Sequence, residues 1–276
     1  MTQSPVISTT ELQKLLGQAH LKIIDASWWM NGRDARADFE QAHIAGAVFI
    51  DIDEVSDATS DLPHTLPSHD QFAAVMSRNG ISHNDQIVVY DTQGLFSAAR
   101  VWWLLRLFGA EQAQVLDGGL PKWLADGYAT QSGPSNPTPL ATFSAKPSAS
   151  KVASFEDVRE ALGSDVQILD ARGAPRFNAV VPEPRKGVRS GHMPAALNLP
   201  YTQLLNADGT IKDGPLLEAA FKDIGFDFDR PVITSCGSGV TAAILTLGLE
   251  ILGKPSRLYD GSWTEWGSRM DTPIAP

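Results

Sequence analysis

The chain contains a single cysteine, Cys236, among its 276 residues. One cysteine cannot form an internal disulfide, and it cannot supply the several thiolates of a cysteine-rich zinc site. We therefore expect neither a metal nor a disulfide framework, and a reducing, cytoplasmic location fits best. In that setting the lone thiol is either inert core packing or a reactive group.

Long apolar runs and excess positive charge are also missing. No apolar stretch approaches the roughly 18 residues that a transmembrane helix needs. The first residues, MTQSPVISTTELQKLL, lack the basic start and apolar core of a secretory signal. The 32 acidic residues outnumber the 22 Lys and Arg residues, which gives a net charge of −10. We therefore expect no nucleic-acid partner and no membrane partner.

The chain repeats itself once. IIDASWW at Ile23 matches ILDARGA at Ile168, AHIAGAVFI at Ala42 matches GHMPAALNL at Gly191, and LDGGLPKW at Leu116 matches YDGSWTEW at Tyr259. A gapless alignment of VVYDTQGLFSAAR with VITSCGSGVTAAI places Thr92 opposite Cys236. Four matches in one order predict a duplicated domain. A Pro-, Ser- and Thr-rich segment separates the halves and reads as a linker. We expect domains at 1–135 and 152–276 and a linker at 136–151.

Each half alternates short apolar runs with helix-like stretches. KIID, QIVVY and PVITS have the composition of buried strands, while TELQKLLGQA and SFEDVREALG have capped, amphipathic helical patterns. The alternation predicts an α/β fold in each half, with a parallel sheet covered by helices on both faces. In such folds the reactive crevice lies beyond the carboxyl ends of the strands. Cys236 directly follows the predicted strand RPVITS.

The loop after Cys236 is suited to holding an anion. Gly237 and Gly239 allow tight backbone curvature, and the helix expected from about Thr241 directs its positive dipole end at the loop. The curled N–H groups and the dipole both favour a thiolate over a thiol. The alternative is a small buried hydrophobe at a tight turn. The context of strand, cysteine, glycine loop and helix favours the reactive thiol.

These motifs resemble those of the rhodanese sulfurtransferases. The resemblance rests on CGSGVTA, on DAR at Asp170, on GHMPAALN and on YDGSWTEW, and it extends over nearly the whole chain. It implies two tandem rhodanese-like domains, of which only the second carries the catalytic cysteine. The Gly-Ser-Gly loop is similar to that of members that use 3-mercaptopyruvate as the sulfur donor. Members that use thiosulfate carry Arg and Lys after the cysteine, where this chain has Gly237 and Ser238.

The resemblance also implies the roles of individual residues. Cys236 would be the nucleophile that becomes a persulfide, Arg176 and Arg185 would bind the donor carboxylate, and a relay of Ser238, His64 and Asp53 would move a proton. The backbone of the loop would bind the transferred sulfur through Gly237, Gly239, Val240 and Thr241. A thiol, reduced thioredoxin or cyanide would accept the sulfur, and no cofactor is implied.

Three alternatives remain at this point. In the first, the chain is a sulfurtransferase whose donor is thiosulfate. In the second, it is a non-catalytic persulfide carrier or sensing module. In the third, it is a phosphatase of the same fold. A phosphatase needs an arginine six residues after the cysteine, where this chain has Ala242, so that function is disfavoured. The two donor arginines also have a plainer interpretation as part of a solvated basic surface with Arg172, Lys186 and Arg189.

Overall fold

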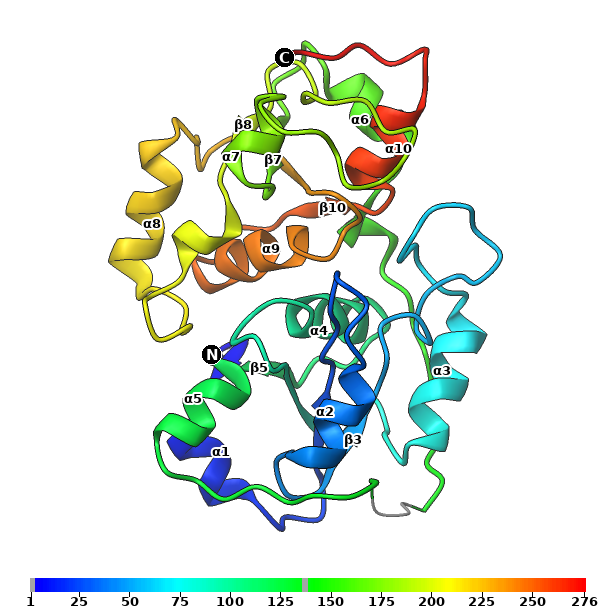
Figure 1. The fold of residues 1–276 in the computed structure, drawn as a ribbon, viewed down its shortest axis with the longest axis vertical. Helices are drawn as coiled ribbons and strands as arrows, with labels where there is room; N and C mark the ends of the chain where they lie inside the picture. The colour runs from blue at the N-terminus through cyan, green and yellow to red at the C-terminus, as the bar shows by residue number, and fades with distance from the viewer. Residues whose placement is uncertain (1–2, 136–138) are drawn as a thin grey trace. The chain divides into compact units, whose positions relative to one another are not determined.

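The computed structural model describes residues 3–135 and 139–276 (Figure 1). It divides into two compact units, which we call the first and the second unit. The first consists of Met1–Ala58, Leu66–Ser148 and Asn206–Thr210, and the second of Thr59–Thr65, Ala149–Leu205 and Ile211–Pro276. Residues 136–138 of the predicted linker 136–151 lie outside the described residues.

The first unit is built on a parallel sheet of five strands in the order β1-β5-β4-β2-β3. Its strands are β1 Val6–Ile7, β2 Leu21–Asp25, β3 Ala47–Phe49, β4 Gln86–Tyr90 and β5 Ala113–Leu116. Its helices are α1 Thr9–Leu15, α2 Ala35–Gln41, α3 His69–Arg78, α4 Ala98–Leu107 and α5 Gly119–Ala125.

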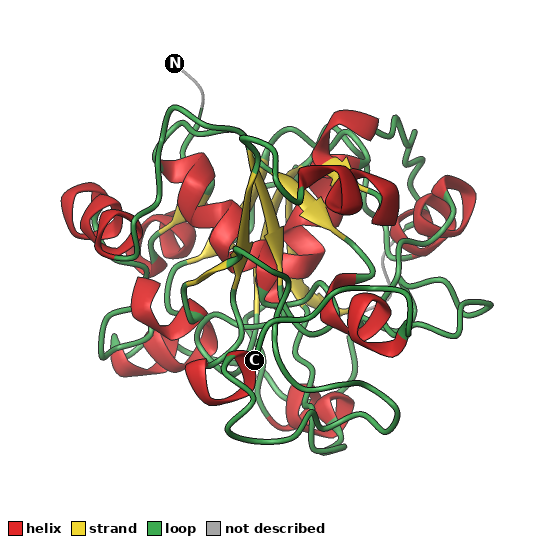
Figure 2. Ribbon diagram, turned by 90° about the horizontal axis from the view of Figure 1, so that it is seen from above, coloured by secondary structure: helices red, strands yellow, loops and turns green. Residues whose placement is uncertain are grey.

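The second unit repeats this design with the strand order β6-β10-β9-β7-β8, again all parallel. Its strands are β6 Val152–Ala153, β7 Gln167–Asp170, β8 Leu197–Asn198, β9 Val232–Ser235 and β10 Arg257–Tyr259. Its helices are η1 Ala149–Lys151, α6 Phe155–Ala161, α7 Ala174–Phe177, η2 Tyr201–Leu204, α8 Gly214–Asp223, α9 Ala242–Ile251 and α10 Ser262–Ser268. The equivalent strand order confirms the predicted tandem α/β architecture. Figure 2 shows the strands of the structure in yellow and the helices in red.

In each unit, side chains of the sheet pack with side chains of the helices in a hydrophobic core. In the first unit, Leu12 of α1, Phe39 of α2 and Trp123 of α5 pack with Ile23 and Val88 of the sheet. In the second unit, α6 and α10 form the corresponding layer, in which Trp266 takes the place of Trp123. Both tryptophans are fully buried, as expected for core residues.

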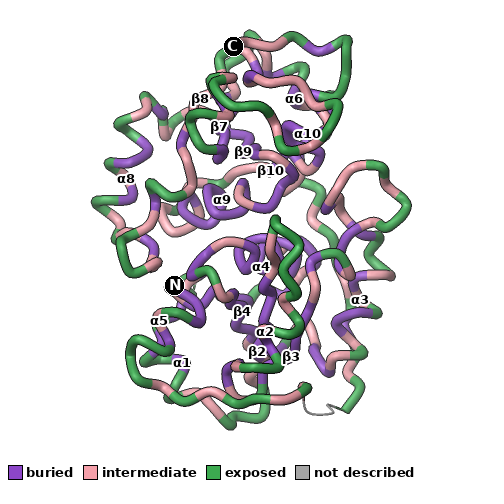
Figure 3. Tube along the Cα trace, viewed as in Figure 1, coloured by how far each residue is buried: buried purple, intermediate pink, exposed green. Residues whose placement is uncertain are grey.

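The opposite face of the second sheet carries α9. The hydroxyls of Thr234 in β9 and Thr246 in α9 lie 2.9 Å apart and form a hydrogen bond. A Cβ at Gly248 would lie 3.1 Å from Leu204 and 3.5 Å from Leu217, so the glycine lets α9 approach η2 and α8 closely. Helix α9 is buried along most of its length (Figure 3). This burial fixes the N-terminal end of α9 beside the carboxyl end of β9.

The first helix of each unit begins with the same cap. Ser8 accepts the N–H of Glu11 and Ser154 accepts that of Asp157, and in both cases the acidic side chain accepts the N–H of the serine. Such capping boxes satisfy two backbone donors at once. The sequence correctly indicated a Ser/Thr cap for both helices.

The register of the strands corrects the match of Thr92 with Cys236 that the gapless alignment of the two halves gave. Ala26 N–H donates to Tyr90 O, and in the second unit Ala171 N–H donates to Ser235 O. The residue that follows Tyr90 is Asp91, and the residue that follows Ser235 is Cys236. Asp91, not Thr92, therefore occupies the position of Cys236 in the first unit. The expectation was wrong by one residue because the loop before α4 is one residue longer than the loop before α9.

Among residues 3–135 and 139–276, no helix combines the length and the apolar character that crossing a bilayer requires.

Candidate active site

Cys236 lies at the carboxyl end of β9 as a free thiol with only 2% of its surface exposed. Its backbone is held by the segment that starts α10: Cys236 N–H donates to Ser262 Oγ at 3.2 Å, and Trp263 N–H donates to Cys236 O at 3.0 Å. Ser262 has the left-handed φ of 49°, a conformation that costs free energy in a residue other than glycine. The conformation of Ser262 therefore serves to fix the cysteine.

The loop from Gly237 to Thr241 curls back toward the cysteine. Gly239 has a φ of 78°, which glycine adopts without steric cost, and Thr264 donates both its N–H and its hydroxyl to Gly237 O. Within the described part of the chain, the N–H groups of Gly237, Val240 and Ala242 donate to no protein acceptor. Free donors at the start of a ten-residue helix form a site for negative charge.

The first unit shows how such a loop accommodates an anionic group. The Asp91 carboxylate accepts the N–H groups of Gln93 at 2.9 Å, Phe96 at 2.7 Å and Ala98 at 2.9 Å. Burial raises the pKa of Asp91, while these backbone hydrogen bonds act to lower it. The first unit thus fills its own loop with a side-chain carboxyl group. In the second unit, the smaller Cys236 leaves the corresponding donors available.

The two predicted donor arginines have different environments. Arg176 packs against the loop, since a Cβ at position 237 would lie 3.1 Å from its Nη2, and it is ion-paired to Glu183. Arg185 is partly buried, and its guanidinium donates no hydrogen bond to the described part of the protein. Burial lowers the pKa of Arg185 most and the Arg176 charge lowers it further, whereas Cys236 and Glu183 raise it. A ligand carboxylate would complete the interactions of Arg185.

Sequence reasoning missed the charged network behind Arg176. Arg172 is buried, holds Asp170 through Nε and Nη2, and donates to Glu183 Oε1 at 2.9 Å. Its guanidinium carbon also lies 4.4 Å from the Trp263 ring centre. The alternative of a solvated basic surface is therefore wrong for Arg172. The DAR motif, in which a buried strand ends in an acid and a base two residues apart, could have indicated the Asp170–Arg172 pair but not the contribution of Glu183.

Ser238 and His64 are brought together within the second unit. His64 Nδ1 lies 3.0 Å from Ser238 Oγ, and both residues are buried. The direction of this hydrogen bond depends on the imidazole tautomer. His64 has a φ of 58°, an uncommon conformation for a residue other than glycine. A strained histidine beside a serine of the loop is a suitable proton-transfer pair.

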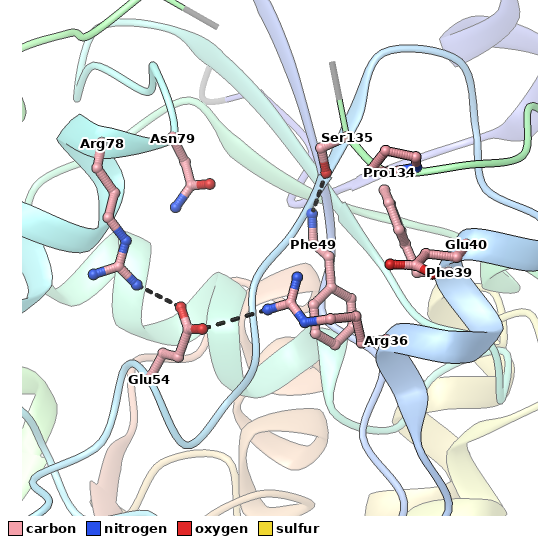
Figure 4. Close-up of a pocket in the computed structure, with 9 residues that line it drawn as sticks. All are labelled: Arg36, Phe39, Glu40, Phe49, Glu54, Arg78, Asn79, Pro134 and Ser135. Carbon is pink, nitrogen blue, oxygen red and sulfur yellow. Dashed lines mark hydrogen bonds and ion pairs between the residues drawn. The ribbon is translucent and has the colours of Figure 1, made fainter. Parts of the chain in front are cut away.

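Asp53, the third predicted member of the relay, belongs to the first unit, so its contact with His64 stays a prediction. It lies in a turn where its N–H donates to Asp51 Oδ1, and burial together with the Asp51 charge raises its pKa. The neighbouring Glu54 lies between Arg36 and Arg78 in a surface pocket of about 320 Å³ (Figure 4). These ion pairs anchor the turn that carries Asp53.

His43 and His192 have the equivalent structural role in both units. Nδ1 of His43 is hydrogen-bonded to Phe39 O at 2.8 Å, and Nδ1 of His192 to Phe177 O at 3.0 Å. Each imidazole also stacks on the ring of the same phenylalanine. Their function is therefore to join a helix to the backbone that follows it.

Comparisons with known proteins agree with this geometry. The family model described as the rhodanese-like domain matches residues 8–126 and again residues 154–269. The chain is 43% identical over 270 residues to the 3-mercaptopyruvate sulfurtransferase of Escherichia coli (strain K12). The alignment covers 96% of this chain and 95% of the Escherichia coli protein. The chain is also 41% identical over 297 residues to thiosulfate/3-mercaptopyruvate sulfurtransferase 1, mitochondrial, of Arabidopsis thaliana. This alignment covers 99% of this chain and 78% of the Arabidopsis protein.

The crystal structure of SseA from Escherichia coli, a 3-mercaptopyruvate sulfotransferase, superposes with a TM-score of 0.87 at 39% identity. The superposition covers 95% of this chain and 99% of that chain. The similarity therefore extends over both repeats and is not confined to the cysteine loop.

Proposed function

Since this chain belongs to the rhodanese-like domain family, we propose that it is a 3-mercaptopyruvate sulfurtransferase. The observation that carries the proposal is the buried Cys236 at the start of a loop with free N–H groups, where the cysteine interacts electrostatically with the Arg185 guanidinium. This arrangement offers a nucleophile, a site for an anionic sulfur and a cation for the donor carboxylate. The reaction produces pyruvate and a sulfur atom carried on the protein.

In the first half-reaction, the Cys236 thiolate attacks the sulfur of 3-mercaptopyruvate. A sulfur–sulfur bond forms and the donor's carbon–sulfur bond breaks, and the electron pair of that bond goes to carbon, giving the enolate of pyruvate. The enolate takes up a proton, and we assign the hydrogen-bonded Ser238–His64 pair as its source. The relay continues to Asp53 in this proposal. The persulfide left on Cys236 is stabilised by the N–H groups of Gly237 and Val240.

In the second half-reaction, a thiolate such as that of thioredoxin, or cyanide, attacks the outer sulfur of the persulfide. The sulfur–sulfur bond breaks and its electron pair returns to Cys236, which regenerates the thiolate. Two successive transfers through one covalent intermediate predict ping-pong kinetics. The single free thiol is compatible with the reducing, cytoplasmic compartment that we propose for this reaction.

Thiosulfate is the second candidate donor, because the Arabidopsis relative carries both donors in its name. The local charge argues for mercaptopyruvate. Thiosulfate is a dianion, and neither residue after the cysteine, Gly237 or Ser238, supplies a cation. A non-catalytic persulfide carrier is the third candidate, and it would accept sulfur without turning over a small donor.

Initial rates with the two donors test the proposal. With cyanide as the common acceptor, we expect kcat/KM for 3-mercaptopyruvate to exceed that for thiosulfate by at least about tenfold, or about 1.4 kcal/mol of transition-state discrimination. Pyruvate formation and thiocyanate formation are the two readouts. A preference for thiosulfate would contradict the donor assignment, and single-turnover sulfur uptake without steady-state turnover would indicate a carrier.

A further inference from the structure

Glu183 is the shared ligand of two arginines and has only 3% of its side chain exposed. Its Oε1 accepts Nη1 of Arg172 at 2.9 Å and Nε of Arg176 at 3.2 Å, while Oε2 accepts Nη2 of Arg176. A carboxylate held in this way is fixed in position and is not free to bind a substrate. Glu183 therefore acts on the site through Arg176 and through its charge.

The network around Glu183 is electrically neutral. Two carboxylates and two guanidiniums form it: Asp170, Glu183, Arg172 and Arg176. All three nitrogens of the Arg172 guanidinium are engaged, because Asp170, Glu183 and the backbone oxygen of Gly191 accept hydrogen bonds from them. Arg176 directs Nε and Nη2 at Glu183, and its guanidinium lies beside Gly237, where a Cβ would be 3.1 Å from Nη2 and 3.8 Å from Nη1. The network thus presents hydrogen-bond donors to the loop without adding net charge.

Arg185 adds a cation beside this network, and its guanidinium forms no ion pair with a residue that the structure describes. It interacts electrostatically with Arg176, Glu183 and Cys236, and its guanidinium donates no hydrogen bond to a described residue. Apart from the charge of the Cys236 thiolate, which is the same for either donor, a single positive charge is the sum over Asp170, Glu183, Arg172, Arg176 and Arg185. That charge matches 3-mercaptopyruvate, whose carboxylate is its only charged group while its thiol is protonated. It leaves one charge of thiosulfate without a partner.

We propose that Glu183 is a specificity-determining residue, whose buried charge limits the donor site to one net positive charge and so selects a monoanionic sulfur donor over a dianionic one. The inference rests on the proposed function. Without Glu183, Arg176 and Arg185 would together give the site two positive charges, which suits a dianion. Glu183, through its negative charge, reduces this sum to one. It does so while orienting Arg176, which makes it a positioning residue as well.

Substitution of Glu183 by glutamine tests the charge. Glu183→Gln keeps the shape of the side chain and one acceptor oxygen but removes the negative charge. We expect the ratio of kcat/KM for thiosulfate to kcat/KM for 3-mercaptopyruvate to rise about tenfold, with a larger rise at low ionic strength, because charge effects weaken as salt screens them. Loss of activity with both donors by the same factor would overturn the proposal, because a purely structural role predicts that result.

Two further variants separate charge from geometry and from folding. Glu183→Asp keeps the charge and shortens the side chain, so we expect both donors to lose activity together and the donor ratio to stay as in the wild type. A rise in the ratio for Glu183→Asp would overturn the proposal even if Glu183→Gln did not fold. Glu218→Gln on α8 removes one exposed negative charge from the same unit and should leave the ratio unchanged. A matching rise in that control would likewise overturn it.

The failure of the proposed function gives a different result from the failure of this inference. If the wild-type protein does not turn over 3-mercaptopyruvate, the proposed function fails before any variant is made. If the wild-type protein prefers 3-mercaptopyruvate and Glu183→Gln retains that preference, only the role of Glu183 fails.

Discussion

Cys236→Ser is expected to lower kcat with 3-mercaptopyruvate by at least about a thousandfold. A serine hydroxyl at the same position is far less ionised than a thiol, and the persulfide intermediate needs a sulfur atom. The loop donors and Arg185 remain in place, so donor binding should persist. Pyruvate release under saturating donor and cyanide measures the effect.

Cys236→Ala is the matched control for this variant. It removes the nucleophile without adding a hydroxyl, and we expect the same loss of turnover. Both side chains are small, so the melting temperature of each variant should stay within a few degrees of that of the wild type, as expected for a change of about 1 kcal/mol or less. Turnover above a few per cent in either folded variant would show that another group carries the sulfur.

Asp25→Asn is expected to raise the free energy of unfolding at pH 7 by up to about 3 kcal/mol. Asp25 is fully buried at the end of β2, where its Oδ1 accepts the N–H of Ser27, and burial raises its pKa from 3.8 to about 6. Because the folded state holds this proton more tightly than the unfolded state, stability is lost as pH rises from about 4 to about 6. Asparagine resembles the protonated acid and removes that dependence.

Asp170→Asn is the matched variant in the second unit and should have the opposite effect. Asp170 ends β7 as Asp25 ends β2, but it is paired with the buried Arg172 at 2.7 Å. Removing its charge leaves the guanidinium poorly compensated, at a cost of about 3–5 kcal/mol. Denaturant unfolding between pH 4 and pH 7 gives both differences from the wild type. A loss of stability for Asp25→Asn at pH 7 would contradict the assigned burial effect.

The sequence was sufficient to predict the repeat, the parallel sheets and the loop that begins at Cys236. These features are encoded locally, by apolar runs of strand length, by serine caps and by glycines before a helix. Two matching halves also supported each other, since the same order of elements had to explain both.

Three features could not be predicted from the sequence. The extra residue before α4 is invisible in a gapless alignment, so Thr92 was matched with Cys236 although hydrogen bonding places Asp91 there. Glu183 is separated from Asp170 by a loop, and their connection through Arg172 exists only in three dimensions. The left-handed backbone of His64 likewise depends on tertiary contacts.

The central claim is that Cys236 accepts sulfur directly from 3-mercaptopyruvate. It is tested most directly by mixing equimolar protein and 3-mercaptopyruvate without an acceptor, and by measuring pyruvate and the mass of the peptide that contains Cys236. The proposal predicts one equivalent of pyruvate and a mass gain of one sulfur atom on that peptide, which cyanide then removes. Pyruvate release with no sulfur on the peptide, or sulfur bound elsewhere in the chain, would contradict it.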